Sequence, residues 1–194
     1  MSKLKIYTYL TLFLAIGLGI FLVSRIKFSI DEESRITRAE NLIIDNLKII
    51  RDAQVTFQSV KGSYTSDWDS LINFVENGKI FIVQRREETV LLDYGAEETT
   101  LYLDTLGSIS VIDSVFSEYK SFNPNSMKFV PGYENVIFEM WAGQIEKGGV
   151  SVNVVEVRNP KPVDPDRKES NEANINKPLR FGSRTSITTA GNWE

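Results

Sequence analysis

The 194-residue sequence contains no cysteine and no histidine, and this double absence excludes several kinds of chemistry. Zinc sites in proteins are built mainly from Cys and His ligands. Cysteine nucleophiles, and catalytic triads in which histidine is the base, need the same two residue types. The sequence also has no glycine-rich phosphate-binding loop of the Walker or dinucleotide type. We therefore expect no cofactor, no Cys/His metal site and no enzyme of these classes.

Basic residues are also in the minority, with 22 Lys and Arg against 26 Asp and Glu, so that the net charge is −4. This balance provides no global positive field for nucleic acid, and we expect no nucleic-acid partner. The reactive groups that remain are carboxylates, which can act in pairs as acid and base. The candidates are Asp93, Glu97, Glu98, Asp104, Glu139, Glu146 and Glu156. Because acidic residues are abundant, a solvated surface is the favoured interpretation of these groupings, and no calcium-loop spacing is present.

One segment lacks charge altogether, since Ile6–Ser24 is a run of 19 uncharged, mostly apolar residues. A membrane-spanning helix needs about 20 such residues. The residues after Val23 contain no pair of small residues of the kind that a signal peptidase cuts. The sequence therefore predicts a retained membrane anchor over residues 1–28 and not a cleaved leader.

The orientation and packing of the anchor follow from its flanks and its small residues. Two basic residues precede the run and two follow it, so the charge rule is nearly balanced. Because the leading tail is short, we expect the N-terminus in the cytoplasm and the rest of the chain outside it. Ala15, Gly17 and Gly19 are small enough for another membrane helix to approach, although membrane helices use glycine often in any case.

A long amphipathic helix is predicted over Ile30–Lys61. Its apolar residues recur at steps of three and four, at Ile36, Ala39, Ile43, Leu47, Ile50, Ala53, Phe57 and Val60. No proline or glycine occurs between Gly19 and Gly62, so the anchor and this helix can form one rod. We expect the apolar stripe to pack on a sheet, and the alternative is a parallel coiled coil.

Gly62 is expected to end the long helix in the left-handed conformation. A second helix is predicted over Asp67–Asn77, with Ser66 as its N-cap and Gly78 at its end. Its apolar face consists of Trp68, Leu71, Ile72 and Val75.

From Lys79 the apolar residues alternate with a period of two, which indicates strands. The predicted strands are Ile80–Gln84, Val90–Tyr94, Thr100–Thr105, Ser108–Ile112 and Met127–Val130, with a turn at Arg85-Arg86-Glu87-Glu88. The clearest hairpin joins Val136–Glu146 to Val150–Val157, because Gly148 and Gly149 suit a tight turn. These elements predict an α+β fold, in which an N-terminal transmembrane helix continues into a long amphipathic helix packed on an antiparallel sheet over residues 29–158.

The C-terminal part divides into a polar linker over residues 159–178 and a final segment over residues 179–194. The final segment regains large apolar residues, among them Leu179, Phe181 and Trp193. We expect it to dock, either as a strand on its own domain or on a partner.

The layout of an apolar helix, an amphipathic continuation and an antiparallel sheet resembles that of type IV pilins and pseudopilins. The join between helix and head adds a local likeness in Ala53-Gln54-x-x-Phe57, Gly62-x-Tyr64-Thr65 and Trp68-Asp69-x-Leu71. However, Ile6–Ser24 contains no glutamate and no glycine precedes it, whereas pilins carry a glutamate in the apolar run after a processing glycine. This departure counts against assembly as a filament.

Four segments carry a second resemblance: Ile50-Arg51-Asp52-Ala53-Gln54-Val55, Lys61-Gly62-x-Tyr64, Ala142-Gly143-x-Ile145-Glu146-Lys147-x-Gly149-Val150 and Thr189-x-Gly191-Asn192-Trp193. Through these segments the chain as a whole resembles a family of single-pass envelope proteins of the Bacteroidota. The resemblance implies a bacterial inner-membrane protein whose C-terminal domain lies in the periplasm, and it transfers no catalytic residues.

The sequence thus favours a non-catalytic scaffold subunit of an envelope machine for secretion, gliding, pilus-like assembly or energy coupling. Its partners would be other inner-membrane or periplasmic proteins, and a homo-oligomer is compatible with this interpretation. Leu179, Phe181 and Trp193 are the candidate docking residues. The alternatives are a pilin-like filament subunit, a carboxylate-dependent periplasmic enzyme and a ligand sensor.

Overall fold

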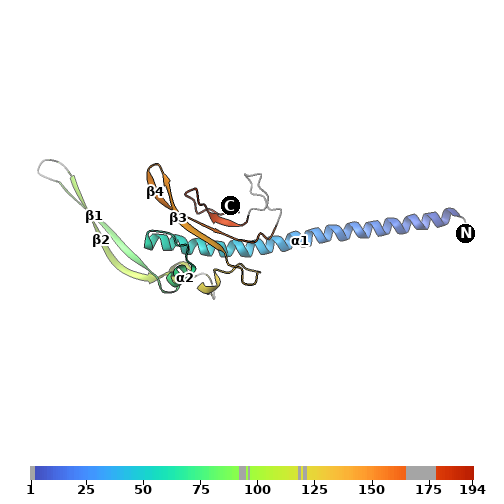
Figure 1. The fold of residues 1–194 in the computed structure, drawn as a ribbon, viewed down its shortest axis with the longest axis horizontal. Helices are drawn as coiled ribbons and strands as arrows, with labels where there is room; N and C mark the ends of the chain where they lie inside the picture. Colours follow the sequence, from blue (N-terminus) through green and yellow to red (C-terminus); the bar gives the residue numbers. More distant parts are fainter. Residues whose placement is uncertain (1–2, 92–94, 96, 118, 120–121, 165–177) are drawn as a thin grey trace.

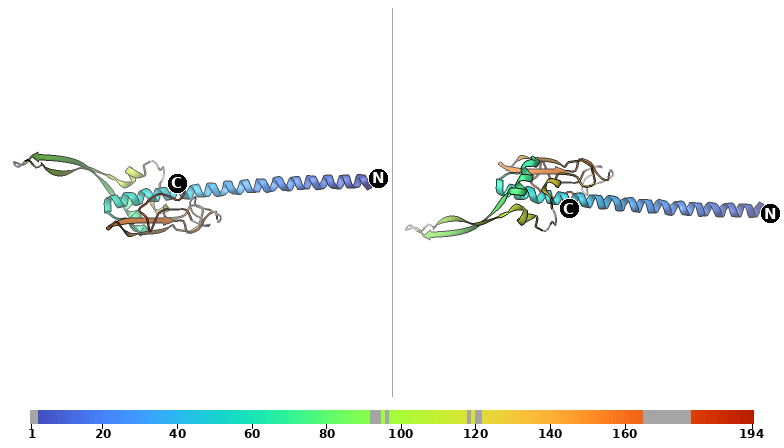
Figure 2. Two further views of the ribbon diagram at one scale, coloured as in Figure 1. Left: turned by 90° about the horizontal axis from the view of Figure 1, so that it is seen from above. Right: turned by 90° about the horizontal axis from the view of Figure 1, so that it is seen from below.

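The computed structural model describes residues 3–91, 95, 97–117, 119, 122–164 and 178–194. It has an α+β fold, which confirms the predicted fold class: a long N-terminal helix is combined with antiparallel sheets. Figure 1 shows the helix as a rod, with its N-terminal half projecting freely and its C-terminal half packed in a head. A two-stranded ribbon leaves the head at the end farthest from the N-terminus, and the two views of Figure 2 agree on this.

The rod is helix α1 (Lys3–Lys61), whose 59 residues span about 88 Å at 1.5 Å per residue. In the described part of the chain it is the one helix long and apolar enough to cross a membrane, and its most apolar window has a mean hydropathy of 2.0 with none of it buried. The apolar segment and the predicted amphipathic helix are therefore one continuous helix, as predicted, because α1 has no break between them.

The C-terminal half of α1 packs on the head through the predicted stripe. Ile43, Leu47, Ile50 and Ala53 are fully buried in one cluster with residues of the sheet and of helix α2 (Trp68–Asn77). This part of the apolar stripe is therefore buried in the head of its own chain, as expected, and a coiled coil with a second chain is not needed to bury it.

The join between α1 and α2 is held by a buried amide. Gln54 is fully buried, and its Nε2 donates to the carbonyl of Thr65 at 2.7 Å while its Oε1 accepts from the Thr65 N–H at 3.2 Å. Gly62 ends α1 with a φ of 82°, as predicted. The predicted N-cap Ser66 is wrong by one residue, because the extended Asp67 caps α2 and accepts from the Ser70 N–H at 2.8 Å.

The head contains a three-stranded sheet in the order β3-β4-β5, formed by Glu139–Lys147, Val150–Arg158 and Arg180–Gly182. The predicted glycine turn is confirmed, since Gly148 and Gly149 both have positive φ. Val155 and Val157 project from β4 into the core, and the C-terminal segment supplies β5 to the same sheet. The core therefore lies between this sheet, α1 and α2.

The second sheet is a ribbon of β1 (Lys79–Leu91) and β2 (Glu97–Ser110) alone. The predicted turn at Arg85–Glu88 is wrong, because these four residues lie inside β1 and pair with residues 100–103. The predicted strand Ser108–Ile112 is also wrong in part, since Ser108–Ser110 end β2 and Val111 begins helix α3 (Val111–Val115). Part of the predicted strand Val90–Tyr94 falls outside the described residues.

The remaining segments wrap around α1. A short 3-10 helix, η1 (Pro124–Ser126), precedes the predicted strand Met127–Val130, which forms only an isolated bridge between Phe129 and Ile137. Asn46 of α1 donates to the carbonyls of Met127 and Phe129 at 3.2 and 3.0 Å, which fastens this segment to the helix. Most of the predicted linker, residues 165–177, lies outside the described residues.

Candidate functional site

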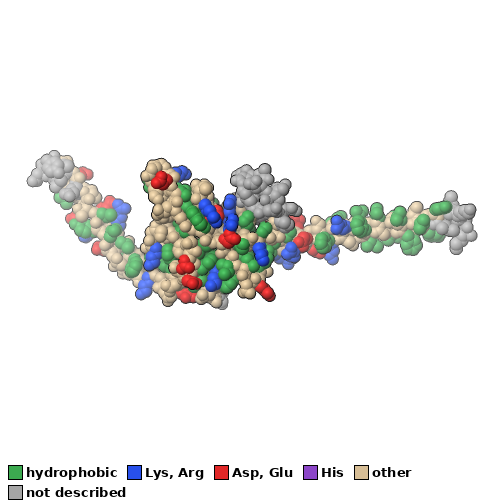
Figure 3. Space-filling view, in the orientation of Figure 1, with side chains coloured by type: hydrophobic (Ala, Val, Ile, Leu, Met, Phe, Trp, Pro, Cys, Tyr) green, Lys and Arg blue, Asp and Glu red, His purple; other side chains and the backbone are tan. Residues whose placement is uncertain are grey.

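The small residues predicted to pack in the membrane lie on the exposed half of α1. Ala15, Gly17 and Gly19 are all exposed. Apart from the neighbouring residues and the backbone of the same helix turns, no atom of the described chain lies within 4 Å of a Cβ placed at either glycine. Figure 3 shows apolar side chains on this half of the rod. The three positions are therefore accessible to another helix.

The three residues predicted to dock belong to the head itself. Leu179 and Phe181 are 2% and 0% exposed within the hydrophobic core, and Trp193 packs against the same core. The side chain of Glu194 accepts from Arg51 Nη1 of α1 at 2.6 Å, which lowers the pKa of this carboxyl. Of the two predicted alternatives, the structure places the segment on its own domain.

Two of the three candidate carboxylates on the three-stranded sheet are paired with arginines. Glu139 accepts from Arg158 Nε at 2.6 Å on the neighbouring strand. The largely buried Glu156 accepts from Arg184 Nε at 2.8 Å, and the guanidinium of Arg184 lies 5.4 Å from the centre of the Trp141 ring. The two contacts of Arg184 fasten the C-terminal segment to the sheet, because this residue follows β5.

The other candidate carboxylates are spread over distant positions. Glu97 and Asp104 are exposed on the ribbon, and Glu146 is exposed near the end of β3. Asp93 and the side chain of Glu98 lie outside the described residues. Within the described chain no group of three Asp or Glu residues is arranged to hold a metal ion, and the described candidates do not converge on one cleft.

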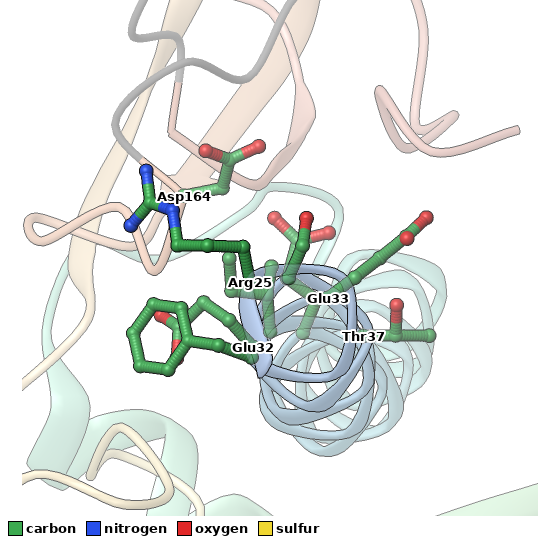
Figure 4. Close-up of a pocket in the computed structure, with 9 residues that line it drawn as sticks. Arg25, Glu32, Glu33, Thr37 and Asp164 are labelled. Carbon is green, nitrogen blue, oxygen red and sulfur yellow. The ribbon is translucent and has the colours of Figure 1, made fainter. Parts of the chain in front are cut away.

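An open cleft of about 690 Å³ lies beside α1, just beyond the apolar segment (Figure 4). It is lined by Arg25, Phe28, Ser29, Glu32, Glu33, Ile36, Thr37, Glu40 and Asp164. Asp164 comes from the segment after β4, and the other residues come from one side of the helix. Glu32 accepts from Arg35 Nη2 at 2.7 Å, and this hydrogen bond lowers the pKa of its carboxyl. The cleft is thus acidic and largely solvated.

The ribbon is the most unusual surface of the molecule. Ten of its large apolar side chains are between 39% and 70% exposed: Phe81, Ile82, Val83, Val90, Leu91, Leu101, Tyr102, Leu103, Leu106 and Ile109. Its base is fixed to the head by a 3.0 Å bond from the Val111 N–H to the Gly78 carbonyl, and Ser110 caps α3. Beyond this base the strands run into solvent (Figures 1 and 3).

The register of the strands assigns each residue to one of two faces, since opposite residues point the same way. The Arg85 face consists of Lys79, Phe81, Val83, Arg85, Glu87, Thr89, Leu91, Glu97, Thr99, Leu101, Leu103, Thr105, Ser108 and Ser110. The Arg86 face consists of Ile80, Ile82, Gln84, Arg86, Glu88, Val90, Thr100, Tyr102, Asp104, Gly107 and Ile109. The bulge after Ile82 leaves Leu106 outside this alternation.

Side-chain contacts agree with this assignment. On the Arg85 face, Arg85 forms an ion pair with Glu87, and the hydroxyl oxygens of Thr89 and Thr99 lie 3.2 Å apart. On the Arg86 face, the guanidinium of Arg86 lies 5.2 Å from the centre of the Tyr102 ring. Each face therefore mixes charged and apolar side chains.

A free two-stranded ribbon is marginally stable in water, and sheet edges are normally covered or protected. No third strand pairs with β1 or β2 in the described chain, and neither strand contains proline. The sequence prediction missed this surface because a run of four charged residues was interpreted as a turn. The signal that could have revealed it is the absence of Gly, Pro, Asn and Asp from Arg85–Glu88, since these residue types dominate turns.

The structure thus presents one exposed apolar helix segment and one exposed ribbon, at opposite ends of the molecule (Figure 1). Large exposed apolar patches mark contacts with other proteins or with membranes. No protein-family model, curated protein or solved structure matches the chain.

Proposed function

We propose that the protein is a membrane-anchored scaffold subunit of a multiprotein complex of the bacterial envelope, with its head in the periplasm. The observation that carries this proposal is the ribbon, which exposes ten large apolar side chains at the end of the head remote from the apolar helix segment. Exposed apolar surface of this kind is typical of protein contacts. The ribbon is accordingly the main contact surface, and the exposed half of α1 is the anchor.

The dimensions of the chain support a spacing role. From Arg25 to Lys61 the helix is about 55 Å long at 1.5 Å per residue. The 13 residues of β1 add a ribbon of about 43 Å at 3.3 Å per residue. Because α1 contains no proline or glycine between Gly19 and Gly62, it is a stiff support that holds the ribbon far from the membrane.

A filament subunit is the second candidate, and the unbroken helix favours it because pilin-like layouts use such a helix. The absence of a glutamate from Ile6–Ser24 counts against it. The enzyme alternative has less support, because two of its candidate carboxylates, Glu139 and Glu156, are paired with arginines.

The test is recovery of the tagged full-length protein, expressed at its native level, after extraction in a mild detergent. We expect other membrane or periplasmic proteins to be recovered in fixed ratio with it. A double variant Ile82→Ser/Val90→Ser on the Arg86 face should lose them, whereas Val150→Ser, at a 62% exposed position of the β3–β4 hairpin, should retain them. Recovery of the wild type alone would contradict the scaffold proposal, and long homopolymers would favour the filament subunit.

A further inference from the structure

The Arg85 face of the ribbon is complementary to itself. Between Phe81 and Leu91, the side chains of this face along β1 follow the order Phe81, Val83, Arg85, Glu87, Thr89, Leu91. If a second copy of this strand is laid against the first in the reverse direction, Glu87 lies opposite Arg85, Thr89 opposite Val83 and Leu91 opposite Phe81. The pairs are then an acid with a base, two β-branched residues and two apolar residues. Along β2 the order Thr105, Leu103, Leu101, Thr99 is the same in both directions. Both orders have their centre at the same level, because Arg86 pairs with Tyr102.

We infer that the Arg85 face docks on the Arg85 face of a second copy of this chain, with the two ribbons antiparallel. The inference rests on the proposed function only in taking the ribbon to be a contact surface, and it names the occupant of one face. A two-fold axis between the two faces, perpendicular to the strands at the level of Arg86 and Tyr102, generates the arrangement. It gives the same contacts twice, as a two-fold interface requires.

The axis determines which residues meet. Arg85 of one copy lies opposite Glu87 of the other, and Phe81 lies opposite Leu91. On the second strand Leu103 lies opposite Leu101. The threonines at 99 and 105 face each other at the ends of this leucine pair. Beyond them, Glu97 lies opposite Ser108, whose hydroxyl is a hydrogen-bond donor.

The charges are suited to such a contact. Within one chain Arg85 already forms an ion pair with Glu87, so the dimer brings together four charges of alternating sign. A network of this kind contributes more than an isolated surface pair, because each charge has two partners of opposite sign. The exposed Leu101 and Leu103, at 46% and 63%, supply apolar area beside it.

The Arg86 face does not have this property. An antiparallel dimer centred at the same level would place Arg86 against Arg86 of the second copy, and like charges directly opposite are unfavourable. If two copies instead paired edge to edge through their β1 strands about the same point, Arg86 of one copy would again lie opposite Arg86 of the other. The Arg86 face therefore points outward in the dimer and leaves Ile82, Val90 and Tyr102 for other proteins of the complex.

The size of the face sets the strength of the contact. A ribbon of about 43 Å by 10 Å offers roughly 400 Å² per copy, compared with about 800 Å² per partner in a typical specific complex. The dimer is therefore weak in solution, and a crosslink is better suited to detect it than the mass of the complex.

The first test uses the absence of native cysteine. Two differently tagged full-length chains are coexpressed, one with Leu101→Cys and the other with Leu103→Cys. Membranes are treated with a short bifunctional thiol reagent, because the backbones of facing sheets lie about 10 Å apart, too far for a direct disulfide. We expect a covalently linked dimer containing both tags. The control is Tyr102→Cys in both chains, which lies between these positions in sequence and on the opposite face. Equal crosslinking of the control, or none of the mixed pair, would overturn the inference.

The second test exchanges the charges in chains that carry the cysteine pair. Arg85→Glu and Glu87→Arg should each lower the crosslinked fraction several-fold, because each places like charges opposite one another. The double variant Arg85→Glu/Glu87→Arg restores opposite signs and should recover the crosslink. Failure of the double variant to recover, in a chain with unchanged tryptophan fluorescence, would overturn the proposed register.

The two proposals fail in different ways. A specific crosslink without any copurifying protein supports the dimer and contradicts the scaffold. Copurifying proteins that depend on the Arg86 face, without a crosslink, contradict the dimer and support the scaffold.

Discussion

The β3–β4 hairpin and the β1–β2 ribbon are both antiparallel pairs that carry large apolar residues, yet one is packed and the other is not. Val155 and Val157 of β4 are fully buried, whereas Leu101 and Leu103 of β2 are about half exposed. The first pair is covered by elements of the same chain, and the ribbon beyond its base has no such cover among the described residues. Apolar side chains on a strand indicate that a face is suited to being covered, but they do not identify the element that covers it.

The distribution of charge explains why the two pairs differ. On β4 the core-facing positions are apolar, and the intervening Glu156 is held by Arg184 on the other face. On β1 the neighbours Arg85 and Arg86 place a charge on each face, so neither face of the ribbon suits a dry core. Such faces suit a partner that supplies both apolar area and opposite charge.

The largest expected effect comes from removing residues 179–194. The structure predicts that this truncation abolishes cooperative unfolding of the head, because it removes β5 together with the buried Leu179 and Phe181. Thermal unfolding followed by far-UV circular dichroism measures this. A truncated head that unfolds as the wild type does would show that the segment is not part of the core.

A matched pair of substitutions tests the two sheets directly. Phe181→Ala should lower the free energy of unfolding of the head by about 3–5 kcal/mol, because it empties a fully buried site. Leu103→Ala on the ribbon should change it by less than about 0.5 kcal/mol, as at other exposed positions. Urea unfolding of the full-length protein in detergent measures both. Equal losses would mean that the ribbon belongs to the same folding unit.

The buried amide between α1 and α2 should have an intermediate effect. Gln54→Met keeps much of the side-chain volume and leaves the N–H and C=O of Thr65 without their partner, at a cost of about 1–3 kcal/mol. Val55→Met on the neighbouring exposed position is the control. Similar unfolding curves for the two variants would show that these hydrogen bonds contribute little.

The smallest effect concerns the cap of α2. Hydrogen bonds from the side chain and backbone of Ser70 hold the pKa of Asp67 below its ordinary value of 3.8. The cap therefore stabilises the head fully above this value, and its contribution is lost as the pH falls through the lowered pKa. Asp67→Asn keeps a capping side chain without a titratable group. The stability of the wild type relative to Asp67→Asn should decline between pH 6 and pH 3, and a constant difference would contradict this.

Short-range patterns in the sequence were sufficient for the two longer helices, α1 and α2, and for the glycine hairpin. The apolar stripe of α1, its end at Gly62 and the turn at Gly148 and Gly149 depend on residues close in sequence, and all three agree with the structure. The cap of α2 was misplaced by one residue because Ser66 and Asp67 are both good caps, and only the backbone conformation selects between them.

The ribbon and the C-terminal segment depend on long-range pairing, which one sequence does not reveal. Arg85–Glu88 become a strand because residues 100–103 lie opposite them. Leu179 and Phe181 are in the core because β5 reaches β4, across a segment that composition marks only as a linker. Exposure of the ribbon was equally inaccessible, since apolar alternation predicts a buried face in most strands.

The most direct test of the central claim, that the ribbon is covered in the native assembly, is hydrogen–deuterium exchange. The full-length protein is measured in the complex extracted with mild detergent and again after dissociation to the single chain. If the ribbon is covered in the complex, we expect the amides of residues 79–91 and 97–110 to be protected there and to exchange quickly in the single chain. The amides of β4 should be protected in both states. Equally fast exchange of the ribbon in both states would contradict the claim.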